Sequence, residues 1–433
     1  MYKDPFQLQN LETFDSPTFK KRRTTNRDRN HWEQWNKPSQ QGWKKASSDW
    51  QEFNTKWRAT TTTWPKDDFD FDNNSDGRRP IIPCLPDDQP SIIVRDEYPR
   101  LFEKIFFWGL SMPDSGVLIL GQPGIGKMFF QYYLLIRLLH ENQVVLFTVG
   151  VGGRRTYLFF FDTVYTKEPS THFVQKNMFV VQSSVYANYL DLEWVKRRTA
   201  RVCGMSLWTR QELEIGFRYH PRYKHLMKEL KIVFQKISEV LEQVDDDGDG
   251  GIRGVDQTQT DSVNQRQQIK KSKSKSVLQD HVRKSAYPDV FRFLSNTCAC
   301  IDNLKSAIHL LMTECIYRFG YVARDVFEGI FARNIVLNYH QRALQDIISF
   351  QRLKNMITSG SVGSQYEVIT QIPIPDLDAD DGLDQVVKWK FCLKSKWVEE
   401  ELRKRFLLLD DDDDIHVDSF ANFISRRETN STL

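Results

Sequence analysis

The chain has 433 residues, of which 40% are apolar and 27% charged, and its formal net charge is +3. Six scattered cysteines and an opening segment, Met1–Gln7, without an apolar core argue against a disulfide-framed scaffold and a signal peptide. No run approaches the roughly 18 apolar residues of a membrane-spanning helix. We therefore expect an intracellular protein without membrane contact, built as one folded body with long disordered additions.

The first 84 residues are predicted to be a disordered, basic, tryptophan-rich tail. Leu, Ile and Val are almost absent there, so folding would bury too little apolar surface to offset the lost conformational entropy. Four tryptophans recur at intervals of seven residues: Trp43, Trp50, Trp57 and Trp64. On a helix they would form one stripe able to dock on a partner. The helix-poor run 60–63 favours the alternative, a tail that only carries tryptophans.

A phosphate-binding loop is predicted within residues 116–128. The apolar run Val117–Leu120 has the length of a buried strand, and Phe129–Leu139 is apolar almost all round, as in a helix covered by a sheet. Glycines between them let backbone N–H groups close around a polyphosphate, and Lys127 adds a positive charge. The predicted nucleotide-binding residues are Gly121, Gln122, Pro123, Gly124, Ile125, Gly126, Lys127 and Met128.

The metal half of this predicted site departs from the usual pattern. Met128 stands where a Ser or Thr hydroxyl would ligate Mg²⁺. Asp162 is the only acid that closely follows a predicted strand, so it is the candidate metal ligand. Phosphoryl transfer relies on positioned charge around the phosphates. The sequence therefore predicts ATP binding with weak or absent hydrolysis, and Mg²⁺ only through Asp162.

The predicted nucleotide-binding domain spans residues 85–244. The fold class expected is α/β, a P-loop NTPase-like, mostly parallel sheet flanked by helices. A helix is predicted over Tyr98–Gly109, and residues 189–243 are predicted to be helical. The strands expected beside the loop strand are Val144–Val149, Tyr157–Phe161 and Met178–Val181.

Residues 245–285 are predicted to be a disordered insertion, acidic at first and then basic. Asp245–Asp256 follows the spacing of a calcium loop, but Asp256 stands where a bidentate Glu is usual and no apolar helix face follows. A solvated acidic stretch is the interpretation that we favour. The basic runs 20–29 and 270–284 are typical of nuclear-import or nucleic-acid-binding segments, although either alone could be solvated. Together they predict the nucleus as destination and a nuclear protein or nucleic acid as partner.

The C-terminal part is predicted to be a helical domain, residues 286–409, followed by an acidic tail, residues 410–433. The tail opens with five aspartates, which we interpret as solvated rather than as a metal cage because consecutive side chains diverge. The elements expected in the domain are helices over Ile301–Tyr317, Val326–Tyr339 and Lys394–Leu409 and an edge strand over Gln371–Pro375.

The sequence resembles the nucleotide-binding domain of the fungal Crinkler and retrotransposon-hot-spot-like proteins over most of residues 85–410. The resemblance begins with the loop segment 116–135, GVLILGQPGIGKMFFQYYLL. Four shorter segments look like the family's next strand, its sensor strand, a helix-opening segment and a motif after the domain. They are Tyr157–Phe161, Met178–Ser184, Leu207–Leu213 and Phe319–Asp325.

The resemblance implies an ATPase core of the signal-transducing type. In full-length members such a core is joined to a nuclease-like or kinase-like effector domain and acts in a host nucleus after secretion. Such ATPases often work as assemblies, so a homo-oligomer is expected. Arg324 would sense the γ-phosphate, but we favour an ion pair of Arg324 with Asp325 or Glu328.

The chain also departs from that family in three ways. No acidic strand end is apparent between residues 161 and 178, no ubiquitin-like header is apparent at the N-terminus, and no nuclease carboxylates stand out in 287–433. These departures leave two functional hypotheses. One is a nucleotide-binding switch of Crinkler-like effector type. The other is a non-enzymatic nuclear scaffold that keeps a degenerate phosphate loop.

Overall fold

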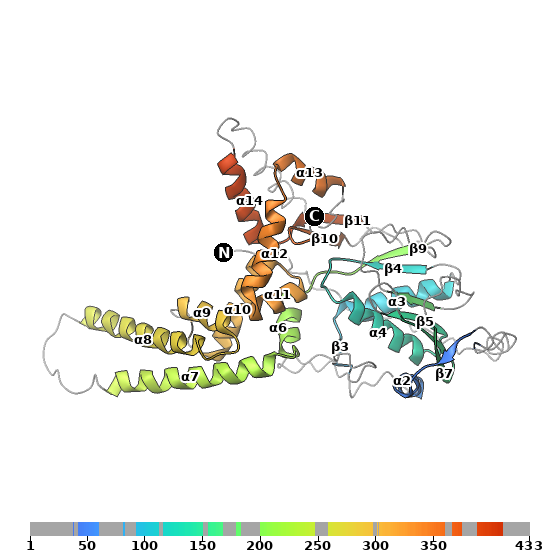
Figure 1. Ribbon diagram of the computed structural model, residues 1–433, viewed down its shortest axis with the longest axis horizontal. Helices are drawn as coiled ribbons and strands as arrows, with labels where there is room; N and C mark the ends of the chain where they lie inside the picture. The colour runs from blue at the N-terminus through green and yellow to red at the C-terminus, as the bar shows by residue number, and fades with distance from the viewer. Residues whose placement is uncertain are drawn as a thin grey trace. The chain divides into compact units, whose positions relative to one another are not determined.

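The computed structural model describes residues 38, 42–59, 81–82, 92–111, 116–149, 155–167, 179–182, 200–246, 259–297, 301, 303–359, 366–374 and 388–409 (Figure 1). Within these ranges the protein is α/β, as predicted. The described residues divide into two compact units. The first unit contains the described residues up to 121 and those within 126–205. The second unit contains residues 122–125 and the described residues within 206–374 and 388–409.

The first unit contains a five-stranded sheet. Its strands are β1 (Lys44–Lys45), β5 (Val145–Val149), β6 (Arg155–Phe160), β7 (Thr163–Lys167) and β8 (Phe179–Gln182). Their order is β1-β7-β6-β5-β8, and neighbours pair antiparallel except β5 and β8, which run parallel with Val145 opposite Phe179. Tyr157, Leu158 and Phe159 are all buried, so both faces of β6 are covered.

A separate parallel pair carries the predicted loop. β4 (Gly116–Leu120) pairs with β9 (Ala200–Gly204), with Leu118 opposite Val202. β9 corrects the prediction that residues 189–243 are helical throughout. Among the described strands antiparallel pairs dominate the larger sheet, so the predicted mostly parallel sheet is not found there. One cause is the two-residue turn between β6 and β7, which is too short to join parallel strands.

Three helices accompany these strands: α2 (Ser48–Ala59), α3 (Glu97–Ser111) and α4 (Lys127–His140). A short antiparallel pair, β2 (Ile81–Ile82) and β3 (Ile92–Ile93), precedes α3. α4 contacts α2, α3, β5 and β8, and every residue from Phe130 to Ile136 is buried. These contacts explain why the helix after the predicted loop is apolar almost all round.

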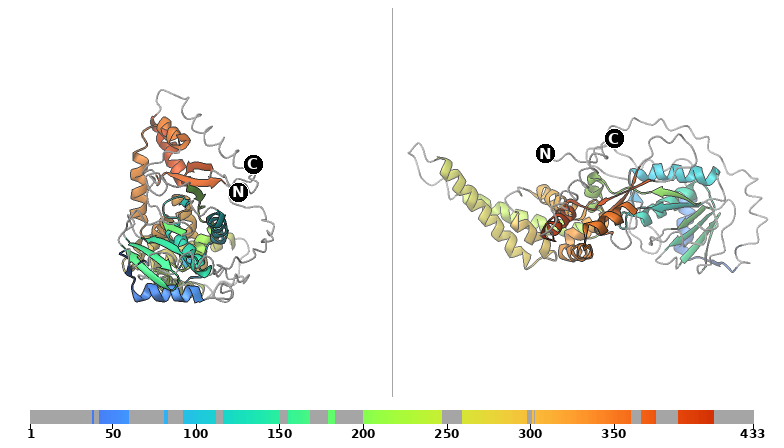
Figure 2. Two further views of the ribbon diagram at one scale, coloured as in Figure 1. Left: turned by 90° about the vertical axis from the view of Figure 1, so that its right-hand side faces the viewer. Right: turned by 90° about the horizontal axis from the view of Figure 1, so that it is seen from above.

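The tryptophan stripe belongs to the core of the first unit. Figure 2 shows α2, in blue, beside the sheet. Trp50 is 1% exposed and stacks on Tyr157, with 4.1 Å between the ring centroids. Trp43 and Trp57 are buried as well, whereas Trp64 lies outside the described residues. The prediction of a disordered tail over 1–84 is therefore wrong for residues 42–59, because tryptophan supplies the apolar area that Leu, Ile and Val do not.

The second unit is mainly helical. Its helices are α6 (Arg210–Arg218), α7 (Tyr223–Asp246), α8 (Gln259–Val282), α9 (Pro288–Asn296), α10 (Leu304–Phe319), α11 (Ala323–Phe331), α12 (Arg333–Gln345), α13 (Phe350–Ser359) and α14 (Lys396–Leu409). One antiparallel hairpin joins them, formed by β10 (Ile369–Ile374) and β11 (Lys388–Leu393). A buried cluster that includes Leu353, Val398 and Leu402 packs α12, α13, β10 and α14 together. The helix predicted over Val326–Tyr339 is in fact two helices that meet at Ala332.

Two predicted boundaries are corrected. The division between the units falls after Met205, so α6 and α7 belong with the helices and not with a nucleotide-binding domain that ends at 244. Residues 259–282 of the predicted disordered insertion 245–285 form α8, which packs against α7 and α9. This helix could not be predicted from the sequence because it has few apolar residues. One of them, Leu278, is buried, with 1% of its surface exposed.

Several predictions fall on residues that the structure does not describe. These are the basic run 20–29, most of the calcium-loop pattern, 247–258, and the acidic tail 410–433. No helix within the described ranges is both long enough and apolar enough to cross a membrane. The prediction of an edge strand near Gln371 is confirmed, since β10 pairs only with β11 among the described strands.

Candidate functional site

Residues 121–127 form the predicted glycine-rich turn between β4 and α4. Gly121, Gly124 and Gly126 have φ angles of 152°, 85° and 95°, a range of positive φ that glycine adopts at little cost. Gly126 is the N-cap of α4 and is in the left-handed conformation. The helix therefore begins at Lys127, and its first N–H groups, which have no partner within the helix, belong to the same turn.

Two carbonyl groups of the turn are held by the second unit, to which residues 122–125 themselves belong. The indole N–H of Trp208 donates to the Ile125 carbonyl at 2.8 Å. The backbone N–H of Arg324 donates to the Gly124 carbonyl at 3.3 Å. Both bonds engage oxygens that would otherwise repel an anion bound at the turn.

The carbonyl groups on either side of this segment are engaged within the first unit. The Tyr98 hydroxyl and the Phe130 N–H donate to the Gly126 carbonyl at 3.4 Å and 3.1 Å. The Lys127 ammonium donates to the Gly121 carbonyl at 2.7 Å. Lys127 therefore reaches back over the turn, where a phosphate could replace the carbonyl as its partner.

The N–H groups of the turn show the opposite pattern. Within the described part of the chain, none of Gly124, Ile125 and Gly126 donates its backbone N–H to another residue. The carbonyls of Gly121, Gly124, Ile125 and Gly126 are thus engaged while three N–H groups of the turn are left over, next to a helix N-terminus and a lysine. Such an arrangement suits an anion with several oxygens, such as a polyphosphate.

Gly124 cannot be replaced without moving its neighbours. A Cβ built on Gly124 would lie 3.0 Å from side-chain atoms of both Val322 and Arg324. Its φ angle of 85° would also strain any other residue. A glycine at position 124 is therefore required by close packing within the second unit as well as by the turn.

Three residues that hold the turn were not recognised from the sequence in this role. Gln122 was expected at the phosphates, but its buried amide instead donates to the Tyr366 carbonyl at 2.8 Å and accepts the Gln371 N–H at 3.1 Å. Tyr98 and Trp208 lie too far from the turn in sequence for any pattern to connect them to it; Trp208 is 83 residues from its partner. The nearby feature that a sequence pattern can identify is the capping box of Thr209 and Glu212, which begins α6 directly after Trp208.

The structure argues against Asp162 as a metal ligand at the turn. Asp162 is exposed in the turn between β6 and β7. Its carboxylate lies close enough to Arg58 to affect the pKa of that guanidinium. Burial lowers the pKa of Arg58 to about 10, and the negative charge of Asp162 acts in the opposite direction and raises it. Arg58 donates to the Gln143 carbonyl at 2.8 Å, directly after the C-terminal end of α4. Asp162 is therefore about one length of α4, roughly 20 Å, from Lys127.

Met128 occupies the position where Mg²⁺ would find a hydroxyl. It lies in the first turn of α4 with 42% of its surface exposed. No cluster of three His, Cys, Asp or Glu side chains suited to a metal ion occurs in the ranges that the structure describes. The turn itself therefore offers donors and one lysine, and its own side chains offer no oxygen ligand for a cation.

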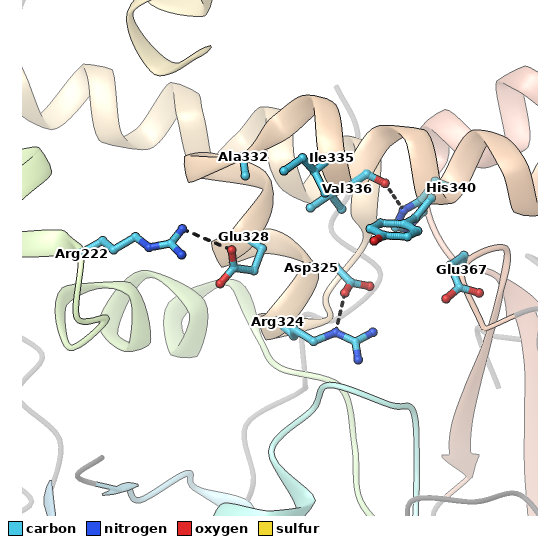
Figure 3. Close-up of a pocket in the computed structure, with 10 residues that line it drawn as sticks. Arg222, Arg324, Asp325, Glu328, Ala332, Ile335, Val336, His340 and Glu367 are labelled. Carbon is cyan, nitrogen blue, oxygen red and sulfur yellow. Dashed lines mark hydrogen bonds and ion pairs between the residues drawn. The ribbon is translucent and has the colours of Figure 1, made fainter. Parts of the chain in front are cut away.

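A pocket of about 430 Å³ lies in the second unit beside α11 and α12 (Figure 3). Its apolar rim includes Ile335 and Tyr339, which are 59% and 60% exposed. Its charged side includes Arg222 and Glu328, which pair at 3.3 Å. The volume falls in the range of small-molecule pockets, so this is a second candidate site.

Asp325 is the most strongly paired residue that lines this pocket. It accepts from Arg324 Nε at 2.9 Å and from Lys394 Nζ at 2.5 Å. Burial raises the pKa of Asp325, but the charges of Lys394 and Arg324 outweigh it, so its pKa lies below the usual value. The ion pair that we favoured for Arg324 is thus present.

His340 lies behind the same pocket and is 1% exposed. Burial, with the nearby charge of Lys394, lowers the pKa of His340 to about 4, so the ring is neutral at pH 7. Its Nδ1 lies 3.0 Å from the Val336 carbonyl and must donate to it, which leaves Nε2 as an acceptor without a partner among the described residues. The Nε2 atom is itself buried, and the neutral His340 ring is not a group poised to transfer a proton near pH 7.

No protein-family model, curated protein or solved structure matches this chain. The resemblance to the Crinkler and retrotransposon-hot-spot-like proteins stays a prediction.

Proposed function

We propose that this chain is a nucleotide-binding switch protein that holds a nucleoside triphosphate on residues 121–127. The observation that carries the proposal is the pairing pattern of the turn: four of its carbonyls are engaged, while the N–H groups of Gly124, Ile125 and Gly126 donate to no described residue. Lys127 adds the positive charge that a triphosphate needs. ATP is preferred over GTP in this proposal on the strength of the resemblance alone.

The position of the turn in the fold supports the same proposal. It follows the carboxyl end of β4, which pairs parallel with β9. Ligands of open α/β sheets bind outside the carboxyl ends of parallel strands, and a helix N-terminus there favours phosphate. The P-loop NTPase fold is accordingly the specific architecture that we propose for the first unit.

Binding rather than hydrolysis is the proposed activity. Met128 supplies no metal-ligating oxygen, and Asp162 lies at the far end of α4. Without a positioned metal or acid, the developing charge of phosphoryl transfer would be poorly stabilised. The competing proposal is a nuclear scaffold that keeps the turn but binds no nucleotide, and the next experiment separates the two.

Replacing Lys127 with alanine is expected to weaken ATP binding by roughly 10- to 100-fold, because a charge-assisted hydrogen bond contributes about 1.5–3 kcal/mol. Isothermal titration of the full chain with ATP and GTP measures the effect. Lys45→Ala is the matched control, since Lys45 is an exposed lysine of the same unit on β1. If the folded wild-type chain binds neither nucleotide, the switch proposal fails and the scaffold remains.

Replacing Met128 with threonine is expected to make ATP binding depend on Mg²⁺. The hydroxyl would occupy the usual metal-ligating position on a residue that is already 42% exposed, so little packing is lost. Met128→Val is the control, because valine has the shape of threonine without the oxygen. We expect Mg²⁺ to tighten ATP binding severalfold more in the threonine variant than in the valine variant. Equal Mg²⁺ effects in both would show that the cation is held elsewhere.

The remaining predictions about partners and destination keep their status as proposals. The effector role and the host nucleus rest on the resemblance and on the two basic runs. The run 20–29 lies outside the described residues. The run 270–284 lies on and directly after α8, a helix that packs against α7 and that the sequence did not predict.

A further inference from the structure

Helices α7 and α8 form a long antiparallel hairpin in the second unit. They contact each other and run side by side in Figure 1. The inner side of α7 is apolar, and Leu226, Leu230 and Val233 are each 0% exposed. α8 contributes Leu278 to this contact. The hairpin is therefore a packed element and its outer surface has a fixed arrangement.

The register of the hairpin is set by Glu229. Its carboxylate accepts from the Ser285 hydroxyl and, at 3.3 Å, from the Ala286 N–H. His281 Nε2 lies 3.5 Å from the same carboxylate. Residue 229 of α7 thus lies beside residues 281–286 at the end of α8. Because both helices rise about 1.5 Å per residue, residues 228–242 of α7 lie alongside residues 270–284, on and after α8.

This register joins two basic segments that are far apart in the sequence. Residues 223–242 and 270–284 together carry ten lysines and arginines and four acids, Glu229, Glu239, Glu242 and Asp280. One of those acids, Glu229, is used within the hairpin. The ten cations are Lys224, Lys228, Lys231, Lys236, Lys270, Lys271, Lys273, Lys275, Arg283 and Lys284. The sequence alone pointed only to the second segment.

Four cations of this basic surface are available to a partner. Lys228, Lys231, Lys273 and Lys275 are all exposed. None of these four forms an ion pair with another described residue. The ten cations of these two segments outnumber the four acids, so a partner that brings many negative charges would be attracted.

The other side chains of the hairpin limit the class of partner. The large apolar side chains exposed on its described part are two isoleucines, Ile232 and Ile269, each 43% exposed. No exposed Trp, Tyr or Phe is present there on which unpaired bases could stack. An apolar face that could enter a membrane surface is also lacking on the outer side. A partner that offers charge without requiring stacking fits best.

We propose that the basic surface of the α7–α8 hairpin binds the phosphate backbone of a nucleic acid duplex without regard to its sequence. A duplex presents one negative charge per about 1.7 Å of its axis. Residues 224–236 alone extend about 18 Å along α7, enough to face several phosphates on either strand. This activity is separate from nucleotide binding at residues 121–127 and does not depend on it.

The test is binding of the full chain to a fluorescent 20-base-pair DNA duplex of random sequence, measured by anisotropy from 50 to 300 mM salt. The variant carries Lys228→Glu, Lys231→Glu, Lys273→Glu and Lys275→Glu, all on the solvent side. We expect its affinity to fall at least tenfold at 100 mM salt. The slope of log affinity against log salt should also become shallower by about 3.5, since each of the four lost phosphate contacts removes about 0.9.

A control variant keeps the number of reversals comparable outside the hairpin. It carries Lys305→Glu, Arg342→Glu, Arg352→Glu and Lys354→Glu, four exposed cations on α10, α12 and α13. The basic run 20–29 is present in every variant, so only the difference between variants reports on the hairpin. Circular dichroism checks that the helices are retained.

Three results would overturn the proposal. The first is an unchanged affinity and salt slope in the hairpin variant, or a loss no larger than in the control. The second is tighter binding to a single strand of equal length than to the duplex. The third is binding to vesicles that contain phosphatidylserine by a chain that does not bind the duplex.

Discussion

Replacing Trp50 with alanine is expected to lower the free energy of unfolding of the first unit by about 3–5 kcal/mol. Trp50 stacks on Tyr157 at 4.1 Å and meets Phe53 and Phe159 edge-on, both at 5.8 Å between centroids. Alanine would remove most of a side chain that is 1% exposed and leave a cavity between these rings. Urea unfolding followed by near-ultraviolet circular dichroism measures the change.

Two further variants separate packing from other roles of Trp50. Glu52→Ala changes an exposed residue of the same helix and should shift the unfolding midpoint little. Trp50→Phe keeps an aromatic ring and should cost less than alanine. Hydrogen exchange should show loss of protection over α2 in the alanine variant. If Trp50 instead served to dock a partner, the alanine variant would unfold at the wild-type urea concentration.

The nucleotide-binding turn could be predicted because its requirements are local. Strand β4, the three glycines, Lys127 and the apolar helix α4 follow one another within 25 residues, and each has a short-range physical reason. What holds the turn could not be predicted in the same way. The bonds from Tyr98, Trp208 and Arg324 depend on tertiary packing that no local pattern encodes.

The elements that were not predicted from the sequence, α2, α8 and β9, were missed for the same reason. Composition favours disorder wherever Leu, Ile and Val are scarce, yet α2 is held by tryptophans and α8 by Leu278 and the carboxylate of Glu229 on α7. The strand β9 was hidden in a span that looked helical, because it is five residues long and pairs with β4, about 80 residues earlier. The conformation of β9 therefore depends on its pairing with β4, and that of α8 depends on its packing against α7.

Metal ligation at Asp162 failed as a prediction for a related reason. An acid after a strand is informative only if that strand ends at the same edge of the sheet as the loop strand. β6 runs antiparallel to β5, so its C-terminal end lies beside the start of β5, where α4 has already ended. Strand direction, which the sequence does not reveal for a short apolar run, decided the outcome.

Removing one charge from the Asp325–Lys394 pair is expected to destabilise the second unit by about 3–5 kcal/mol. The two side chains are 8% and 2% exposed. Asp325→Asn keeps the shape of the side chain but leaves the Lys394 ammonium buried without a charged partner. Lys394→Met should cost less, because Arg324 still pairs with Asp325 and is 55% exposed. The double variant Asp325→Leu with Lys394→Met should recover much of the loss, since no charge is then buried. Urea midpoints at pH 7 measure all three.

The loss in Asp325→Asn should also depend on pH in a defined direction. Lys394 and Arg324 hold the folded pKa of Asp325 below its usual value of 3.8. The stabilisation is therefore fully present above that value and is lost as the pH falls through the folded pKa. The difference in the free energy of unfolding between wild type and Asp325→Asn should be largest at pH 7 and should decrease toward pH 3. The exposed pair Lys404–Glu401 supplies the control, because Glu401→Gln should cost less than about 1 kcal/mol. A gap that stays constant with pH would mean that Asp325 stabilises the unit through shape and packing, not through its charge.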